Sequence, residues 1–157
     1  MYRHILVPLD GSRSGSLALK HAREIALKFG SKVTLIRVVS HSKVAAAGLA
    51  SPESMAAAEM VFEEAQREDA VNLAQAKAYL ANHRRALERA GVKEAATYGE
   101  VGDAGEIILA YAKKRKADLI VMTTRGRSGF ARAFLGSVAD ELIRSAVAPV
   151  LVIKRSN

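Results

Sequence analysis

Five short apolar runs alternate with longer amphipathic segments along the chain, and this alternation is the feature that most restricts its fold. The runs are rich in Val, Ile and Leu, which is typical of strands buried on both faces. Because helix-length connections join consecutive strands, they predict a parallel sheet with helices on both faces. We therefore predict an α/β fold with strands at residues 5–9, 33–39, 92–98, 118–124 and 148–154.

The segments between these runs carry helix signals. Apolar residues recur at spacings of three and four, and Gly30 and Gly91 follow two of the segments as helix stops. Asp103 is placed to cap the third helix, and the basic run 113–116 suits the negative end of its dipole. The predicted helices span residues 12–29, 51–90, 103–116 and 136–146, with turns at 99–102 and a loop at 125–135.

The second predicted helix is unusually long. Ser51, Pro52 and Glu53 form a good start, but a helix from there to residue 90 would measure about 58 Å at 1.5 Å per residue. Since that exceeds a compact domain, we expect a break or a disordered start between about 45 and 60. We expect its acidic residues to form a solvated face: Glu59, Glu63, Glu64, Glu68 and Asp69.

Length and composition restrict the class of protein. A chain of 157 residues predicts one domain, residues 1–157, with a sizeable core. The chain has no Cys, which excludes a disulfide scaffold, a thiolate zinc site and a cysteine nucleophile. No apolar run approaches the ~18 residues of a membrane span, and the N-terminus lacks a signal-peptide core. We expect a soluble, cytoplasmic protein with no membrane partner.

The net charge of +8 is unevenly distributed. Residues 1–50 hold 8 basic and 2 acidic groups, residues 51–100 hold 6 and 9, and residues 101–157 hold 10 and 5. This pattern fits an anionic partner, either nucleic acid or a phosphate ligand, and it also fits a solvated basic surface. Nucleic acid is disfavoured because the chain shows no recognisable reading helix and only 5% of its residues are aromatic.

Two segments follow strands where a doubly wound sheet binds ligands, residues 8–12 and 126–137. In the second, glycines permit close approach of an anion, Gly136 and Ser137 open a helix, and arginines supply countercharge. The alternative is a surface loop with an ordinary Ser cap. Asp10 can accept from ribose or hold a phosphate-bound Mg²⁺, or it can form an Asx turn. The countercharges are Arg125, Arg127 and Arg132.

Residues 5–12, 119–126, 135–139 and 148–152 resemble the universal stress protein family, in the order found there. The resemblance implies an open five-stranded parallel sheet in the order 3-2-1-4-5, an adenine nucleotide alpha hydrolase-like fold, and usually a homodimer. One branch of the family binds ATP or AMP, with Mg²⁺ possible beside ATP. Another branch lacks the glycine motif and binds no nucleotide.

The ATP-binding branch carries Gly, two residues, Gly, nine residues, then Gly followed by Ser or Thr. Here the nine-residue spacing is intact, and Thr123 stands at the first glycine position. By resemblance, Asp10 meets ribose or a metal ion, and Val101 is a further candidate for the adenine pocket. The residues implied in nucleotide binding are Pro8, Asp10, Val38, Met122, Thr123, Arg125, Gly126, Arg127, Gly136, Ser137 and Val138.

The leading hypothesis is an adenine-nucleotide-binding regulatory module of the stress response, and the alternative is a dimeric partner-binding module with a vestigial site. No His pairs with a Ser and an acid at a recognisable spacing, so we expect at most slow ATP hydrolysis. The last strand would lie at an open sheet edge, which pairing with a second copy would cover. The alternative is protection by Lys154 and Arg155. The residues of the predicted dimer strand are Val150, Leu151, Val152 and Ile153.

Overall fold

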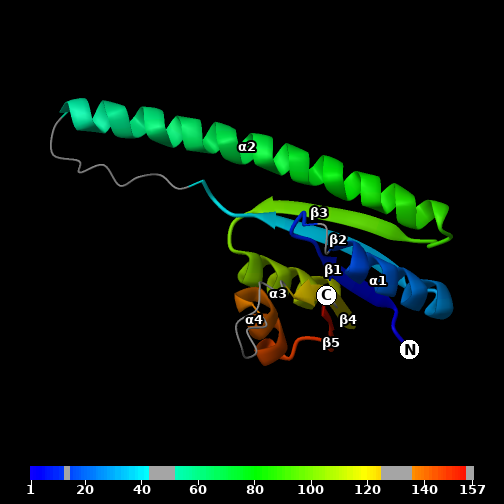
Figure 1. The fold of residues 1–157 in the computed structure, drawn as a ribbon. Helices are drawn as coiled ribbons and strands as arrows, with labels where there is room; N and C mark the ends of the chain where they lie inside the picture. Colours follow the sequence, from blue (N-terminus) through cyan, green and yellow to red (C-terminus); the bar gives the residue numbers. More distant parts are fainter. Residues whose placement is uncertain (13–14, 43–51, 125–135, 155–157) are drawn as a thin grey trace.

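The computed structural model describes residues 1–12, 15–42, 52–124 and 136–154, and only the backbone of residues 52–56 and 124. Within these residues, five strands alternate with four helices (Figure 1). The elements are β1 His4–Pro8, α1 Gly15–Phe29, β2 Lys32–Val39, α2 Pro52–Arg89, β3 Ala95–Val101, α3 Ala104–Arg115, β4 Leu119–Thr124, α4 Ser137–Ser145 and β5 Val150–Lys154.

All five strands lie in one parallel sheet in the order β3-β2-β1-β4-β5. This confirms both the α/β alternation predicted from the sequence and the strand order implied by the family resemblance. The chain first winds outward from β1 to β3 and then returns to β4 on the other side of β1. The winding direction therefore reverses between β1 and β4, where doubly wound sheets bind ligands.

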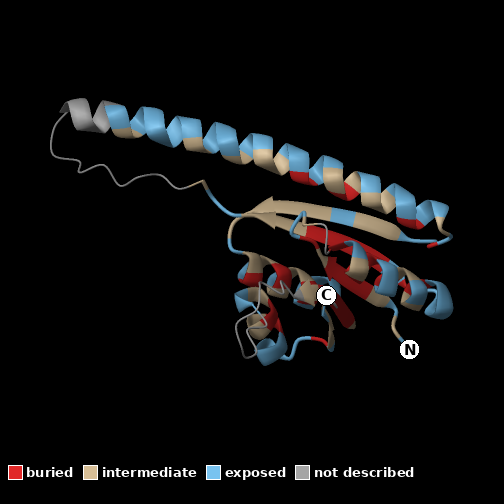
Figure 2. Ribbon diagram, viewed as in Figure 1, coloured by how far each residue is buried: buried red, intermediate tan, exposed pale blue. Residues whose placement is uncertain are grey.

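Two layers of helices cover the sheet. Side chains alternate along each strand, so neighbouring residues such as Ile5 and Leu6 enter different hydrophobic clusters. One cluster packs the sheet against α1 and α2, and the other packs it against α3 and α4. The buried residues concentrate on the central strands and the inward helix faces (Figure 2).

Strand β3 begins and ends three residues later than predicted. Gly99, placed in a turn by its low strand propensity, pairs with Arg37, and Val101 pairs with Val39. Pairing with a long neighbouring strand thus overrides local propensity. Val92, placed in the strand by its apolar character, is instead buried in the connection that precedes β3.

The expected break in the second helix is wrong, because α2 is continuous over 38 residues. Its N-terminal half extends past the sheet, so the width of the domain does not limit its length (Figure 1). Among the described side chains of α2, full burial begins at Ala76, whereas Met60 is 73% and Phe62 is 53% exposed. Packing onto β2 and β3 therefore anchors only the C-terminal half.

The predicted helix cap at Asp103, the helix stops at Gly30 and Gly91 and the basic end of the third helix are confirmed. The Asp103 carboxylate accepts from the backbone N–H of Glu106 at 3.0 Å, and Gly30 and Gly91 take positive φ angles of 66° and 96° after their helices. Lys116 ends α3 in the left-handed conformation, following three basic residues in the last turn. Within the described residues, no helix is long and apolar enough to cross a membrane.

Asp69 departs from the expected solvated acidic face. Its carboxylate accepts from the Ser42 backbone N–H and hydroxyl, both at 2.8 Å, and lies 3.0 Å from His41 Nδ1. The Ser42 N–H, then the Ser42 hydroxyl and His41, hold the pKa of the Asp69 carboxyl below its ordinary value. Asp69 therefore ties the chain after β2 to α2, whereas the other four acids are exposed as predicted.

Candidate functional site

A pocket of about 600 Å³ opens at the carboxyl edge of the sheet, where β1, β2 and β4 end. The N-terminus of α4 forms one end of it, and α2 contributes a side wall. The position is the reversal point of the winding, as predicted for a ligand site. The pocket brings together eight of the predicted site residues: Pro8, Asp10, Val38, Met122, Thr123, Gly136, Ser137 and Val138.

The other predicted site residues are not placed in the pocket. Arg125, Gly126 and Arg127 lie outside the described residues, as does Arg132. Val101, the candidate for the adenine pocket, ends β3 opposite Val39, and Val39 lines the pocket while Val101 does not. The edge position of β3 explains this, because one further strand separates it from β1.

The turn after β1 presents Asp10 to the pocket. The Ser12 backbone N–H donates to Asp10 Oδ1 at 2.9 Å, and Gly11 has a φ of 81°, which favours glycine. Asp10 is exposed and lines the pocket, so the predicted Asx turn and the predicted ligand contact are compatible. The turn fixes one carboxylate oxygen and leaves the group facing the pocket.

The N-terminus of α4 is open. Gly136 is the cap residue, with φ 88° and ψ 146°, and a Cβ built there would meet no atom within 4 Å among the described residues. Ser137 is the first helical residue and not the cap, so the Ser-cap alternative is wrong. Its exposed hydroxyl has no hydrogen-bond partner among the described residues. Free N–H groups and the helix dipole make such an end attractive to an anion.

The side of the pocket formed by the sheet and α3 is apolar. Ile36, Ile108 and Met122 belong to the buried cluster under α3 and α4, and the partly buried Val38 packs against it. These side chains give the pocket a dry surface suited to a flat ring. Val38 and Met122 were expected here, whereas Ile36 and Ile108 were not, because their hydrophobicity marks them only as core residues.

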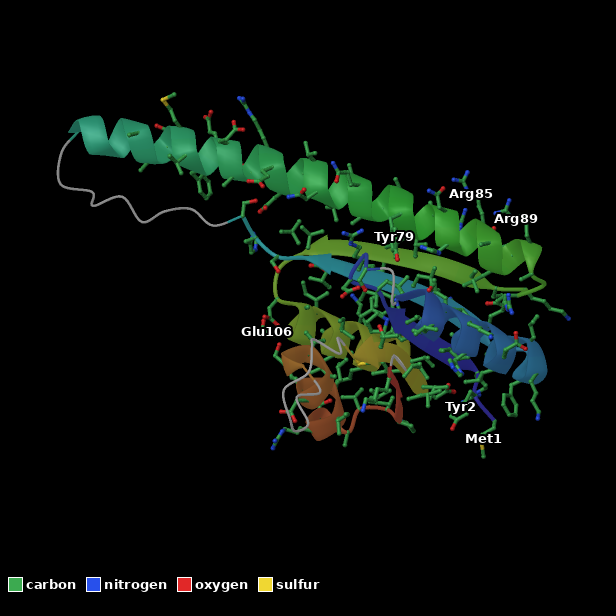
Figure 3. The ribbon with its side chains drawn as sticks, viewed as in Figure 1. Met1, Tyr2, Tyr79, Arg85, Arg89 and Glu106 are labelled. Atoms are coloured by element: carbon green, nitrogen blue, oxygen red, sulfur yellow. The ribbon has the colours of Figure 1, made fainter. Side chains whose placement is uncertain are left out.

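Three polar residues that line the pocket were not predicted from the sequence: Arg37, Asn72 and Gln75. The Arg37 guanidinium carbon lies 5.1 Å from the centroid of the Tyr79 ring, and Tyr79 points from α2 toward the sheet (Figure 3). Burial raises the pKa of the Tyr79 phenol, Asp10 acts in the same direction, and Arg37 opposes it. Asn72, Gln75 and Tyr79 recur at helical spacing, a signal that could have indicated one common face.

No three His, Cys, Asp or Glu side chains of the described residues form a cluster that could hold a metal ion. Asp10 is the carboxylate that lines the pocket. Mg²⁺ at nucleotide sites typically takes one or two carboxylates and completes its shell with phosphate oxygens and water. The residues present therefore fit a Mg²⁺ ion that arrives with a phosphorylated ligand.

The sequence is similar to those of known proteins along nearly its whole length. The family model described as the universal stress protein family matches residues 1–154. The chain belongs to the universal stress protein family. Universal stress protein MJ0531 of Methanocaldococcus jannaschii is 38% identical over 155 residues, which cover 99% of this chain and 84% of that protein.

Solved structures of universal stress proteins share the fold. The structure of the M. jannaschii protein MJ0577 matches with a TM-score of 0.78 at 27% identity, covering 100% of this chain and 99% of that one. A universal stress protein in complex with cAMP matches at 0.69 and 22% identity, with 99% and 98% covered. One from Archaeoglobus fulgidus in complex with dAMP matches at 0.64 and 22%, with 98% of each chain covered. At 22% identity, the likeness to these last two structures shows a shared fold alone.

Proposed function

We propose that this universal stress protein binds an adenine nucleotide, ATP or AMP, in the pocket at the carboxyl edge of the sheet. The observation that carries the proposal is the open N-terminus of α4, where Gly136 and Ser137 face a pocket with an apolar side. A phosphorylated ligand with a flat ring has the chemistry that these two features require. The complexes of the cAMP- and dAMP-bound family members support the same ligand class.

The proposed orientation follows from the order of the elements around the pocket. The phosphates lie at the α4 end, where backbone N–H groups and the Ser137 hydroxyl donate to them. The base lies toward β2, against Val38, and the ribose hydroxyls donate to Asp10 between the two ends. Gly126, Arg125 and Arg127 are proposed to contact the phosphates on the strength of the family motif alone. When ATP is the ligand, Mg²⁺ at Asp10 and the phosphates would neutralise part of the charge.

We propose that occupancy of the pocket, and not turnover, is the output, with ATP hydrolysis slow at most. The protein would then act as a regulatory module of the stress response.

We also propose that residues 1–157 form a single domain and that the protein works in the cytoplasm as a homodimer. The dimer would pair Val150 to Ile153 at the β5 edge, since β5 has a neighbour only on the β4 side within the described sheet.

A second candidate function is a dimeric partner-binding module whose nucleotide site is vestigial. Thr123 supports it, because this residue lines the pocket at the position of the first motif glycine. Its side chain takes up space that a glycine would leave to the ligand. Replacement of Thr123 by Gly separates the two candidates, because nucleotide binding that appears only in this variant would identify the natural site as vestigial.

Titration of the purified protein with ATP and Mg²⁺, followed by calorimetry, tests the proposed function. We expect saturable binding at one site per chain, with AMP competing for it. Asp10→Ala is expected to weaken binding by about tenfold, the ~1.4 kcal/mol scale of one good contact. The matched control is Asp103→Ala, which removes a helix cap outside the pocket. Absence of heat and of displacement at millimolar ATP would rule out the proposal.

A further inference from the structure

We infer that the polar wall formed by Arg37, Asn72 and Gln75 reads the hydrogen-bonding edge of the base and makes the pocket selective for adenine. The inference rests on the proposed function and names the residues that choose the base. It assigns to α2 a direct part in ligand recognition. Arg37 lines the pocket from β2, and Asn72 and Gln75 line it from α2.

We place the polar wall away from the proposed phosphate site, because β2 and β4 lie on opposite sides of β1. The strands that end at the pocket stand in the order β2, β1, β4, and α4 opens beyond β4 in the chain. If the phosphates lie at Gly136 and Ser137, the opposite end of the ligand reaches β2. That end of a nucleotide is the base.

The pocket at β2 has two chemically different sides. Ile36 and Val38 belong with the cluster under α3 and α4, and Arg37 points to the other side because side chains alternate along a strand. A base has apolar faces and a polar edge. The apolar side would therefore contact a face of the base, and the polar wall would meet its edge.

The Tyr79 ring and the backbone at Gly11 hold the Arg37 guanidinium in place. Its guanidinium lies over the Tyr79 ring, and a Cβ built on Gly11 would come within 2.7 Å of its Nη2 atom. No hydrogen bond or ion pair engages this guanidinium among the residues that the structure describes. A fixed guanidinium with unused donors is preorganised to bind a ligand acceptor, because little side-chain entropy remains to be lost.

The carboxamides of Asn72 and Gln75 supply the hydrogen-bond acceptors that the Arg37 guanidinium lacks. Neither takes part in a hydrogen bond within the described part of the chain. Adenine presents an amino donor at N6 next to a ring acceptor, whereas guanine presents the O6 acceptor there. A guanidinium only donates, so the carboxamide oxygens are the groups of the polar wall that can accept from N6. Asn72 and Gln75 therefore determine the preference for adenine, while Arg37 donates to ring acceptors that both purines share.

The test measures ATP and GTP affinities by calorimetry for the natural chain and for the double variant Asn72→Leu/Gln75→Leu. Leu keeps the approximate size of the side chains and removes their hydrogen bonds. We expect the natural chain to favour ATP, and the double variant to lose about tenfold or more in ATP affinity with little change for GTP. Gln66→Leu, at an exposed position of α2 outside the pocket, is the matched control and should change neither affinity.

Arg37→Met gives a second, independent readout. This variant should weaken the binding of ATP and of GTP by similar factors, since the guanidinium donates to acceptors that both bases carry. Thermal melting of each variant confirms that it is folded before its affinities are compared. This keeps the inference testable if one variant does not fold.

The possible outcomes separate the proposed nucleotide binding from the inferred role of the polar wall in base selection. If the natural chain binds ATP but does not discriminate against GTP, or if the double variant keeps the same ATP-to-GTP ratio, the inference about the polar wall is overturned and nucleotide binding stands. If the natural chain binds neither nucleotide, the proposed function fails and the inference fails with it. The inference is supported if the ATP-to-GTP affinity ratio falls in the double variant while both affinities of Gln66→Leu stay unchanged.

Discussion

The guanidinium of Arg37 lies over the ring of Tyr79, with 5.1 Å between the guanidinium carbon and the ring centroid. This contact joins β2, which ends at the pocket, to α2, which covers the sheet. It also gives a charged side chain a fixed orientation beside the turn that carries Asp10. The long helix is therefore part of the candidate site as well as part of the core.

Loss of the Tyr79 ring should loosen Arg37. A cation–π contact at a partly exposed position contributes about 0.5–1 kcal/mol. We expect Tyr79→Leu to weaken nucleotide binding by roughly two- to fivefold, whereas Tyr79→Phe, which keeps the ring, should stay near the natural affinity. Calorimetric titration with ATP measures both. Equal losses in the two variants would show that the hydroxyl, and not the ring, is what matters.

Gly136 and Gly30 form a matched pair for testing the phosphate end of the pocket. Both have positive φ, 88° and 66°, and a Cβ on either would meet no described atom within 4 Å. Valine is strained at positive φ in both places, so each substitution should lower stability. Only Gly136→Val places methyl groups where the phosphates are proposed to bind.

We therefore expect Gly136→Val to weaken ATP binding by about tenfold or more and Gly30→Val to leave it within about twofold, the larger effect being one contact of ~1.4 kcal/mol. Titration of both variants below their melting temperatures provides the comparison. Similar losses in both would assign the effect to general destabilisation instead of to the pocket.

Local sequence signals were sufficient for most of the strands and for one helix start. Apolar runs located the strands, and Asp103 marked a helix start correctly, because each depends on a few neighbouring residues. Strand β3 was misplaced because pairing with β2 decides its bounds. The length of α2 was misjudged because the N-terminal half of this helix extends past the sheet. The motif residues that line the pocket were expected from the family resemblance. Arg37, Asn72 and Gln75 were not, because only the docking of α2 on β2 brings them together.

The bonds to Asp69 predict a specific dependence of stability on pH. The folded state lowers the pKa of this carboxyl below the ordinary value of 3.8. The stabilisation is thus complete above the unfolded pKa and is lost as pH falls through the lower folded value. Asp69→Asn should lower the urea midpoint at pH 6, and the difference from the natural chain should shrink from about pH 4 downward.

Urea unfolding between pH 2 and 6 checks this prediction. Glu68→Gln is the control, because Glu68 is the adjacent acid and is exposed. Glu68→Gln should not lower the urea midpoint at pH 6 by a comparable amount. A gap for Asp69→Asn that stays constant to pH 2 would contradict the assignment, since it would not depend on the charge of the carboxyl.

The proposed dimer predicts that a charge in the middle of β5 prevents association. In antiparallel pairing across a two-fold axis, the middle residue Val152 lies close to its own copy. Like charges opposite each other destabilise a strand pair. We expect the natural chain to sediment as a dimer and Val152→Asp to sediment largely as a monomer. Thr97→Asp, at an exposed position of the other edge strand, should remain dimeric. A monomeric natural chain at micromolar concentration would refute the pairing.

His4 links the last residue of α3 to β2, at the end of the sheet opposite the pocket. Its Nδ1 lies 3.1 Å from the carbonyl oxygen of Arg115, and its Nε2 lies 2.8 Å from the hydroxyl of Thr34, which is fully buried. Because a carbonyl oxygen only accepts, Nδ1 carries the proton of the neutral ring, and Nε2 accepts from the Thr34 hydroxyl. Removal of the ring would leave that hydroxyl buried without its partner.

A double-mutant cycle measures the link between His4 and Thr34. A buried hydroxyl left unpaired costs about 1–3 kcal/mol, so His4→Ala should lower the free energy of unfolding by at least that amount. Thr34→Val alone should lower it by about 1 kcal/mol, because one net hydrogen bond is lost. In the His4→Ala background, however, Thr34→Val removes the unpaired hydroxyl and should restore stability. Urea unfolding at pH 8, where an ordinary imidazole is neutral, gives the four values, and strictly additive losses would show that the two side chains are not coupled.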